Sequence, residues 1–227
     1  MTAIDYAGVT LDGDADALTP AVRRALRQGE YEREETECVE LYLDPEDDVV
    51  ELGGGIGYLA CYVDQRLTDD RTHVVVEPNG RLLSLVERHR VLNDASFETV
   101  AAAYATDGPL ASLSVPESFW EASTVWSDPG DRVAHAATVD LETLLDAFGL
   151  SEVALIVDIE GGELALLADE LDVLVERCRI VIVEFHHEAA PYETAEAIRW
   201  AKARIDTSAF DLVDEKGAVA VYRAPDG

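Results

Sequence analysis

Carboxylates and glycines gather where apolar segments of this chain end, and these are residues that can bind a polar ligand. Glu51 precedes the run Gly53-Gly54-Gly55-Ile56-Gly57, and Glu77 ends the next apolar segment. A glycine-rich turn lets a ligand approach the main chain closely and presents amides at the start of a helix. A carboxylate after the second strand can accept the hydroxyls of a ribose. Together, the loop and the acid predict a site for a nucleoside cofactor.

The glycine spacing leaves two classes of cofactor open. A dinucleotide fingerprint has the spacing GxGxxG, whereas Gly53 and Gly55 are followed here by Tyr58 at the third position. This departure weighs against a nicotinamide dinucleotide without excluding it. An NAD-dependent oxidoreductase on a Rossmann fold is therefore the alternative function.

A second group of carboxylates could carry out acid–base chemistry. Asp158, Glu160 and Glu163 follow a strongly apolar segment, with Gly161-Gly162 allowing the chain to turn between them. In open α/β sheets, the carboxyl ends of the strands face the ligand crevice. Asp158 is the first candidate for a general base or substrate contact, and Glu160 is the second. Acids are also favoured at helix starts, so the alternative is that this loop is a helix cap on an acidic surface.

Glu184, His186 and His187 end the next apolar segment. Histidine titrates near neutral pH, so His186 is a candidate proton shuttle, whereas we expect His187 to be solvated. Asp158, Glu160 and Glu184 would also suit Mg²⁺. Three neighbouring acids are weak support in a chain with 47 acidic residues, so we predict no metal site.

Two further segments have less specific patterns. The segment GEYEREETE, which contains Tyr31 to Glu37, could fold over a cofactor, but its charge favours a solvated helix. Trp120 and Trp126 lie in an irregular stretch at 107–138. They could stack on a sugar or an aromatic acceptor, or they could only anchor this stretch to the core.

The elements that must position these residues alternate between apolar strands and helices. Strands are expected at 48–52, 73–77, 97–102, 153–159 and 180–185, and helices at 58–67, 79–93, 140–148, 163–176 and 192–204. A hairpin at 210–213 and 218–223 ends the chain. This alternation predicts a doubly wound, Rossmann-like α/β sheet, mostly parallel with an antiparallel C-terminal edge hairpin. Residues 1–43, with helices at 21–27 and 32–43, are expected to be an N-terminal helical extension of a domain at 44–227.

Five segments, in this order, resemble the FkbM family of class I S-adenosylmethionine-dependent methyltransferases. They are ELGGGIG from Glu51, VVVEPN from Val74, TVDLETLL from Thr138, VDIEGGELALL from Val157 and IVIVEFH from Ile180. The chain departs from the family's usual pattern at Glu51, where the family has Asp, at Gly54-Gly55, often Ala-Asn, and at Ile156, usually Lys.

The resemblance implies a seven-stranded sheet and S-adenosyl-L-methionine as the cofactor. It places Glu51, Gly53, Gly55 and Gly57 along the methionine part, Glu77 at the ribose, and Pro78 and Asn79 beside the adenine, with further adenine contacts from 97–103. The implied reaction is O-methylation of a sugar or another small hydroxylated metabolite, with a small-molecule or glycan acceptor. A non-catalytic cofactor-binding relative is a further alternative.

Composition restricts the partners and the environment. The 227 residues include 47 acidic and 17 basic ones, which give a net charge of −30, while 48% are hydrophobic and can form a core. Such a charge repels nucleic acid and anionic membranes, so neither is an expected partner. We see no signal peptide and no apolar run long enough to span a membrane, and we expect a cytoplasmic protein.

Lys202 and Lys216 are the only lysines in this acid-rich chain, a composition typical of halophilic proteins. The repulsion between dense carboxylates is screened at molar salt, where the Debye length is about 3 Å. We therefore expect the midpoint of thermal unfolding to rise between dilute buffer and molar salt. Equal stability in the two conditions, measured by circular dichroism, would contradict a halophilic origin.

Overall fold

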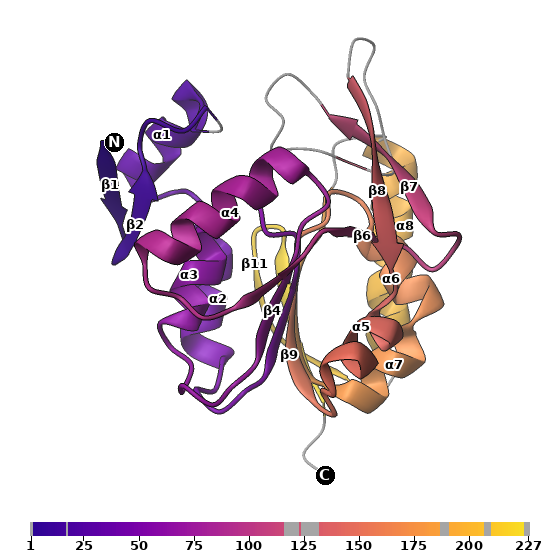
Figure 1. The fold of residues 1–227 in the computed structure, drawn as a ribbon. Coiled ribbons are helices and arrows are strands. Elements are labelled where there is room, and N and C mark those ends of the chain that lie inside the picture. The colour runs from indigo at the N-terminus through magenta and orange to yellow at the C-terminus, as the bar shows by residue number, and fades with distance from the viewer. Residues whose placement is uncertain are drawn as a thin grey trace.

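The computed structural model describes residues 2–16, 18–115, 123, 132–186, 191–206 and 210–224. Its centre is a seven-stranded sheet with the order β11-β12-β10-β9-β3-β4-β5 (Figure 1). The strands are β3 (Val49–Leu52), β4 (His73–Val76), β5 (Glu98–Val100), β9 (Val153–Val157), β10 (Cys178–Glu184), β11 (Asp211–Lys216) and β12 (Val219–Arg223).

Strand direction confirms the predicted fold class. The five strands β5, β4, β3, β9 and β10 pair in parallel, while β12 runs antiparallel to both β10 and β11. The antiparallel strand β12 therefore lies between β10 and β11, and β11 forms one edge of the sheet. Because β3, β4, β9 and β10 are parallel neighbours, their carboxyl ends meet at one edge of the sheet.

Helices cover both faces of the sheet, as a doubly wound fold requires (Figure 1). One core contains buried side chains of α2 (Arg33–Tyr42), α3 (Tyr58–Asp64) and α4 (Gly80–Leu92). The other core contains those of α5 (Leu141–Phe148), α6 (Glu163–Asp169), α7 (Leu171–Arg177) and α8 (Pro191–Asp206). Among the described residues, no helix is long and apolar enough to cross a membrane.

The single helix predicted at 163–176 is divided into α6 and α7. The break falls at Glu170, whose backbone (φ −124°, ψ 26°) is not helical. The Glu170 carboxylate accepts the N–H groups of Leu141 and Glu142, at 2.9 and 3.0 Å. These donors are at the start of α5, where an anion is stabilised by the unpaired amides. The break between α6 and α7 thus coincides with a contact to α5, a helix distant in sequence. The spacing of apolar residues within 163–176 could not indicate such a contact.

The N-terminal segment is not wholly helical, so the predicted helical extension is corrected. It contains α1 (Pro20–Gln28) and α2, but it begins with a hairpin of β1 (Ala3–Tyr6) and β2 (Val9–Asp12). His89 of α4 and Asn93, which follows that helix, accept the N–H groups of Asp12 and Thr10, at 2.9 and 2.7 Å. The hairpin is too short for a clear alternation in sequence and is fixed by these tertiary contacts. The domain boundary at residue 43 stays a prediction.

A smaller sheet follows β5. Its order is β6-β8-β7, with β6 (Ala102–Tyr104), β7 (Leu110–Val115) and β8 (Arg132–Val139). The predicted strand at 97–102 is therefore divided between two sheets, and the stretch at 107–138 contains two strands that its sequence did not indicate. Trp120, Trp126 and His187 lie outside the described residues.

Candidate active site

The glycine loop between β3 and α3 is packed tightly against its neighbours. Gly53 has a φ of +98°, and a Cβ there would lie 1.7 Å from the carbonyl oxygen of Asp158. Gly57 has a φ of +78°, and a Cβ there would lie 2.9 Å from the Cα of Val86. Side chains at these positions would therefore require the backbone to move. This packing brings the loop to the end of β9, next to the candidate catalytic carboxylates.

Glu77 lies directly behind this loop, at the end of β4, and is 4% exposed. Its Oε2 accepts the N–H of Gly55 at 3.1 Å, and its Oε1 accepts the N–H of Asn79 at 2.7 Å. Burial raises the pKa of Glu77 to about 8, although these backbone donors oppose the shift. Each carboxylate oxygen has a further lone pair, so Glu77 can still accept hydroxyl groups from a ligand.

A cavity lies between the glycine loop, the end of β4 and the second sheet. Its lining residues are Leu52, Gly53, Gly55, Val76, Glu77, Pro78, Leu82, Ala102, Ala103, Tyr104, Leu113, Asp158, Ile159, Glu160 and Gly162. Four of the seven predicted cofactor residues are among them: Gly53, Gly55, Glu77 and Pro78. The segment at 97–103 contributes Ala102 and Ala103 to this lining, and its contacts with the adenine stay a prediction. Tyr104 and Leu113 were not predicted, because the second sheet that carries them was not recognised.

The other three predicted cofactor residues do not line this cavity. Glu51 is 1% exposed, and its Oε2 lies 3.6 Å from Nε2 of His73 in the core. Burial raises the pKa of Glu51 well above its usual value and lowers that of His73 to about 4. Gly57 begins α3, and the Asn79 side chain accepts the N–H of Arg81 at the start of α4. Glu51, Gly57 and Asn79 therefore lie near the residues that line the cavity without lining it themselves.

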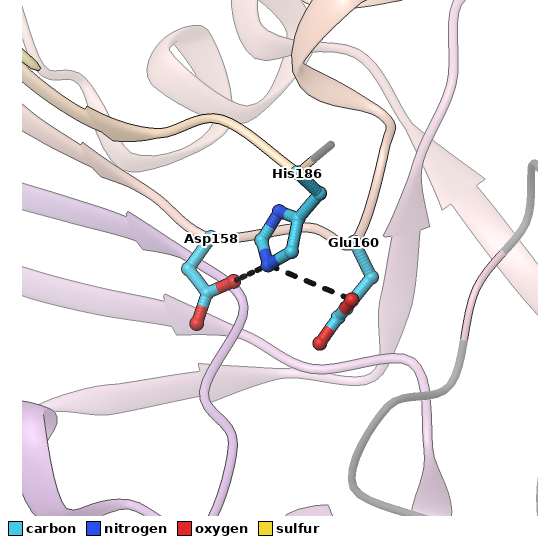
Figure 2. A group of neighbouring side chains, drawn as sticks. All are labelled: Asp158, Glu160 and His186. Atoms are coloured by element: carbon cyan, nitrogen blue, oxygen red, sulfur yellow. Dashed lines mark ion pairs between the residues drawn. The ribbon is translucent and has the colours of Figure 1, made fainter. Parts of the chain in front are cut away.

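The predicted catalytic residues come together, because β9 and β10 are neighbouring parallel strands (Figure 2). Nε2 of His186 lies 3.5 Å from Oδ1 of Asp158 and 3.5 Å from Oε2 of Glu160. On its other side, Nδ1 of His186 lies 2.9 Å from Oε1 of Glu163, which is 1% exposed. Glu184 adds a further carboxylate, 3.6 Å from Nε2.

Asp158 and His186 differ in the pKa that their surroundings give them. Burial favours a neutral His186 ring, but the hydrogen bond to Glu163 and the charges of Asp158 and Glu160 raise its pKa to about 10. Burial raises the pKa of Asp158 to about 7, against the opposing charge of His186. A general base works best when its pKa is close to the working pH. These pKa shifts favour Asp158 as the proton acceptor and His186 as the cation beside it.

The same side chains could hold a metal ion. One ligand atom each from Asp158, Glu160 and His186 lies within 4.8 Å of the others. A histidine binds a metal only through an unprotonated nitrogen, so His186 would first have to lose the proton that its neighbours stabilise. The absence of a metal site stays a prediction.

Residues before β3 also reach the site, contrary to the expectation of a solvated helix. Tyr31 and Glu32 line a second cavity, which shares Gly55, Asp158 and Glu160 with the first. Glu35 is only 6% exposed, and burial together with the charge of Glu184 raises its pKa to about 8.

Helical spacing was the signal that could have found these residues. Glu32 and Glu35 lie three residues apart, and Cys38 follows at the same interval. Residues three or four apart share one face of a helix. Since Cys38 is fully buried, the two acids lie on the face that packs inward.

Comparison with known proteins is consistent with this geometry. The sequence profile of the methyltransferase FkbM domain matches residues 52–208. No curated protein sequence has a significant match to the chain.

Similar solved structures share the fold. The O-methyltransferase TomG from Streptomyces achromogenes, solved with S-adenosylmethionine, has 10% identity and a TM-score of 0.55, covering 96% of this chain and 92% of its own. A Klebsiella pneumoniae protein described as an O-methyltransferase has 9% identity and a TM-score of 0.55, with coverages of 92% and 91%. A Clostridium thermocellum protein described as an rRNA methylase has 9% identity and a TM-score of 0.52, with coverages of 85% and 94%.

Proposed function

The chain belongs to the FkbM family of methyltransferases, and from this premise we propose that it transfers a methyl group from S-adenosyl-L-methionine to a hydroxyl oxygen of a sugar or another small metabolite. One observation carries the proposal: Glu77, the glycine loop and Asp158 line a single cavity. In this arrangement, the catalytic domain at 44–227 is extended by residues 1–43.

The residues of the first cavity suit the adenosine part of the cofactor. Glu77 would accept the ribose hydroxyls, while Pro78, Ala102 and Leu113 offer apolar surface to the adenine. Bound S-adenosyl-L-methionine supplies an electrophilic methyl group on a sulfonium. The chain itself aligns donor and acceptor, which is the main contribution of the enzyme to such a displacement.

Asp158 would remove the proton of the acceptor hydroxyl. Its Oδ1 is buried and has no hydrogen-bond partner among the described residues, so it can accept this proton. As the acceptor oxygen forms its bond to the methyl carbon, the bond between carbon and sulfur breaks, and the hydroxyl proton moves to Asp158. His186, held by Glu163, keeps a positive charge beside Asp158 and favours its ionised form before the transfer.

Charge supports a small, uncharged acceptor over nucleic acid. The names of the similar structures include both O-methyltransferases and an rRNA methylase, so fold likeness does not choose between them. Asp158 and Glu160 line both cavities, and Glu32 lines the second. These carboxylates, in a chain with a net charge of −30, oppose the phosphates of RNA.

A methyl-transfer screen tests this function. The protein is incubated with radiolabelled S-adenosyl-L-methionine and either a small-metabolite fraction or total RNA of the source organism. We expect label in a hydroxylated small molecule and none in RNA, with loss of labelling in Asp158→Asn. Labelling of RNA alone would contradict the proposed acceptor, and labelling of neither fraction would favour a non-catalytic relative.

A further inference from the structure

The turn between β9 and α6 carries Asp158 and Glu160, and its backbone is unusual. Glu160 has a φ of +50° and Gly161 a φ of +98°, so two consecutive residues are left-handed. This conformation is rare for a residue with a side chain, and it persists only where the surrounding structure holds it. The contacts that hold this turn therefore determine where the carboxylates of Asp158 and Glu160 lie.

Glu163, at the start of α6, holds the turn through its main chain. Its side chain is buried, and its Oε1 accepts the N–H of Ile159 at 3.3 Å and the N–H of Gly161 at 3.1 Å. These two amides flank Glu160, so a single oxygen closes the turn around this residue. Acids in the first turn of a helix often accept amides in this way, and on these contacts alone Glu163 would be only a helix cap.

The same oxygen also binds the other half of the cluster. Oε1 of Glu163 lies 2.9 Å from Nδ1 of His186, which follows β10. An ionised carboxylate only accepts hydrogen bonds, so this contact places a proton on Nδ1 and directs Nε2 away from Glu163. Nε2 then faces Asp158 and Glu160, each at 3.5 Å (Figure 2). Glu163 therefore fixes the position of the ring as well as that of the turn.

A further contact reaches the turn from the second sheet. The Ser123 hydroxyl donates to the carbonyl of Glu160 at 2.7 Å, and Ser123 is 2% exposed. Ser123 also exchanges both backbone hydrogen bonds with Ser114 of β7, at 2.8 and 3.0 Å. The carbonyl of Glu160 is thus held from one side and the flanking amides from the other. Both sets of contacts use the main chain of the turn.

We infer that Glu163 is a positioning residue for the methyl transfer, because its Oε1 ties the turn that carries Asp158 and Glu160 to the ring of His186. This inference rests on the proposed function, in which Asp158 takes the hydroxyl proton. Glu163 lines neither the cofactor cavity nor the second cavity, so it acts through its neighbours. A displacement of reacting groups by about 1 Å can lower a rate by about 10²-fold.

Two variants separate the hydrogen bonds of Glu163 from its charge. Glu163→Leu removes the acceptor at similar size, whereas Glu163→Gln keeps an oxygen that accepts. The assay is the initial rate at which radiolabelled S-adenosyl-L-methionine labels the small-metabolite fraction, at a salt concentration where the wild type is folded. We expect Glu163→Leu to lower this rate about 100-fold. Glu163→Gln should stay within about ten-fold of the wild type, because a neutral acceptor forms similar but weaker hydrogen bonds.

Glu170→Leu is the matched control for the loss of a buried acid. Glu170 is also buried and also accepts two amides at the start of a helix, but it binds α5 and not His186. We expect Glu170→Leu to lower the midpoint of thermal unfolding and to leave the labelling rate near that of the wild type. Calorimetric titration with S-adenosylhomocysteine shows for each variant that the cofactor site is folded.

Nuclear magnetic resonance tests the contact with His186 without an acceptor. In ¹⁵N-labelled wild type, the Nδ1–H proton of His186 should resonate downfield and exchange slowly with water, because a buried carboxylate accepts it. Its loss in His186→Gln assigns the signal. In Glu163→Gln the signal should move upfield, while the signals of the other histidines stay in place.

The outcomes separate this inference from the proposed function. An unchanged Nδ1–H signal in Glu163→Gln would overturn the inference, even if Glu163→Leu does not fold. It would also be overturned if Glu163→Gln labels as slowly as Glu163→Leu, which would assign the effect to charge, or if Glu170→Leu loses as much as Glu163→Leu, which would assign it to stability. A wild-type protein that shows the expected signal but labels nothing would contradict the proposed function instead.

Discussion

Replacing Glu77 with alanine should weaken the binding of S-adenosylhomocysteine by about 1–3 kcal/mol, or roughly 5- to 150-fold. The loss has two sources. The ribose hydroxyls lose their acceptor, and the N–H groups of Gly55 and Asn79, which Glu77 now binds, lose their partner. Calorimetric titration of the wild type and Glu77→Ala measures the difference. Glu98→Ala, at an exposed position of the neighbouring strand, is the control for a lost charge.

The same titration separates the two cofactor classes. We expect the wild type to bind S-adenosylhomocysteine and not NAD, since Tyr58 replaces the third glycine of the dinucleotide fingerprint. Tight binding of NAD with none of S-adenosylhomocysteine would contradict the proposed function. Unchanged affinity in Glu77→Ala would show that the ribose site is elsewhere.

Because the pKa of Glu77 is raised, the affinity for S-adenosylhomocysteine should depend on pH. With a pKa of about 8 without ligand, Glu77 is mostly protonated at pH 7, and ionisation adds to its capacity to accept hydroxyl groups. Affinity should therefore rise as the pH increases from 7 to 9. Glu77→Gln cannot ionise, so this part of the pH dependence should disappear in that variant.

The sheet could be predicted because its signals are local. Buried parallel strands are continuous apolar runs, as at 153–157 and 180–183, and glycines mark the sharp turn after β3. The position of Asp158 beside His186 then follows from topology, since parallel neighbours end at the same edge. The elements of the large sheet and its mostly parallel character were therefore within reach of the sequence.

Residues whose roles depend on side-chain direction could not be assigned in the same way. Glu51 and Leu52 are adjacent on β3, yet Leu52 lines the cofactor cavity while Glu51 points to the opposite face, towards His73. Glu32 lines the second cavity from a left-handed backbone, with a φ of +43°. Both depend on tertiary contacts that pattern and composition do not contain.

Asp158→Asn should lower kcat by about 10²- to 10⁴-fold while changing the affinity for S-adenosylhomocysteine by only a few-fold. This range is what a positioned general base typically contributes. Asparagine has nearly the same shape as aspartate, so the packing of Asp158 against Gly53 is retained, because it involves the main-chain carbonyl. Asp172→Asn, an exposed acid on α7, is the control. Wild-type turnover by Asp158→Asn would exclude this residue as the base.

The pH profile distinguishes a base from a residue that only positions the acceptor. Asp158 must be ionised to accept a proton, and its pKa is about 7. Turnover should therefore be constant at higher pH and fall about ten-fold per unit below pH 7, as Asp158 becomes protonated. The residual activity of Asp158→Asn should lack this fall, whereas Glu160→Gln should keep it with an altered midpoint, because Glu160 helps to raise the pKa of Asp158. A fall near pH 7 that persists unchanged in Asp158→Asn would assign the titrating group to another residue of the cluster, with Glu184 the nearest candidate whose pKa burial also raises.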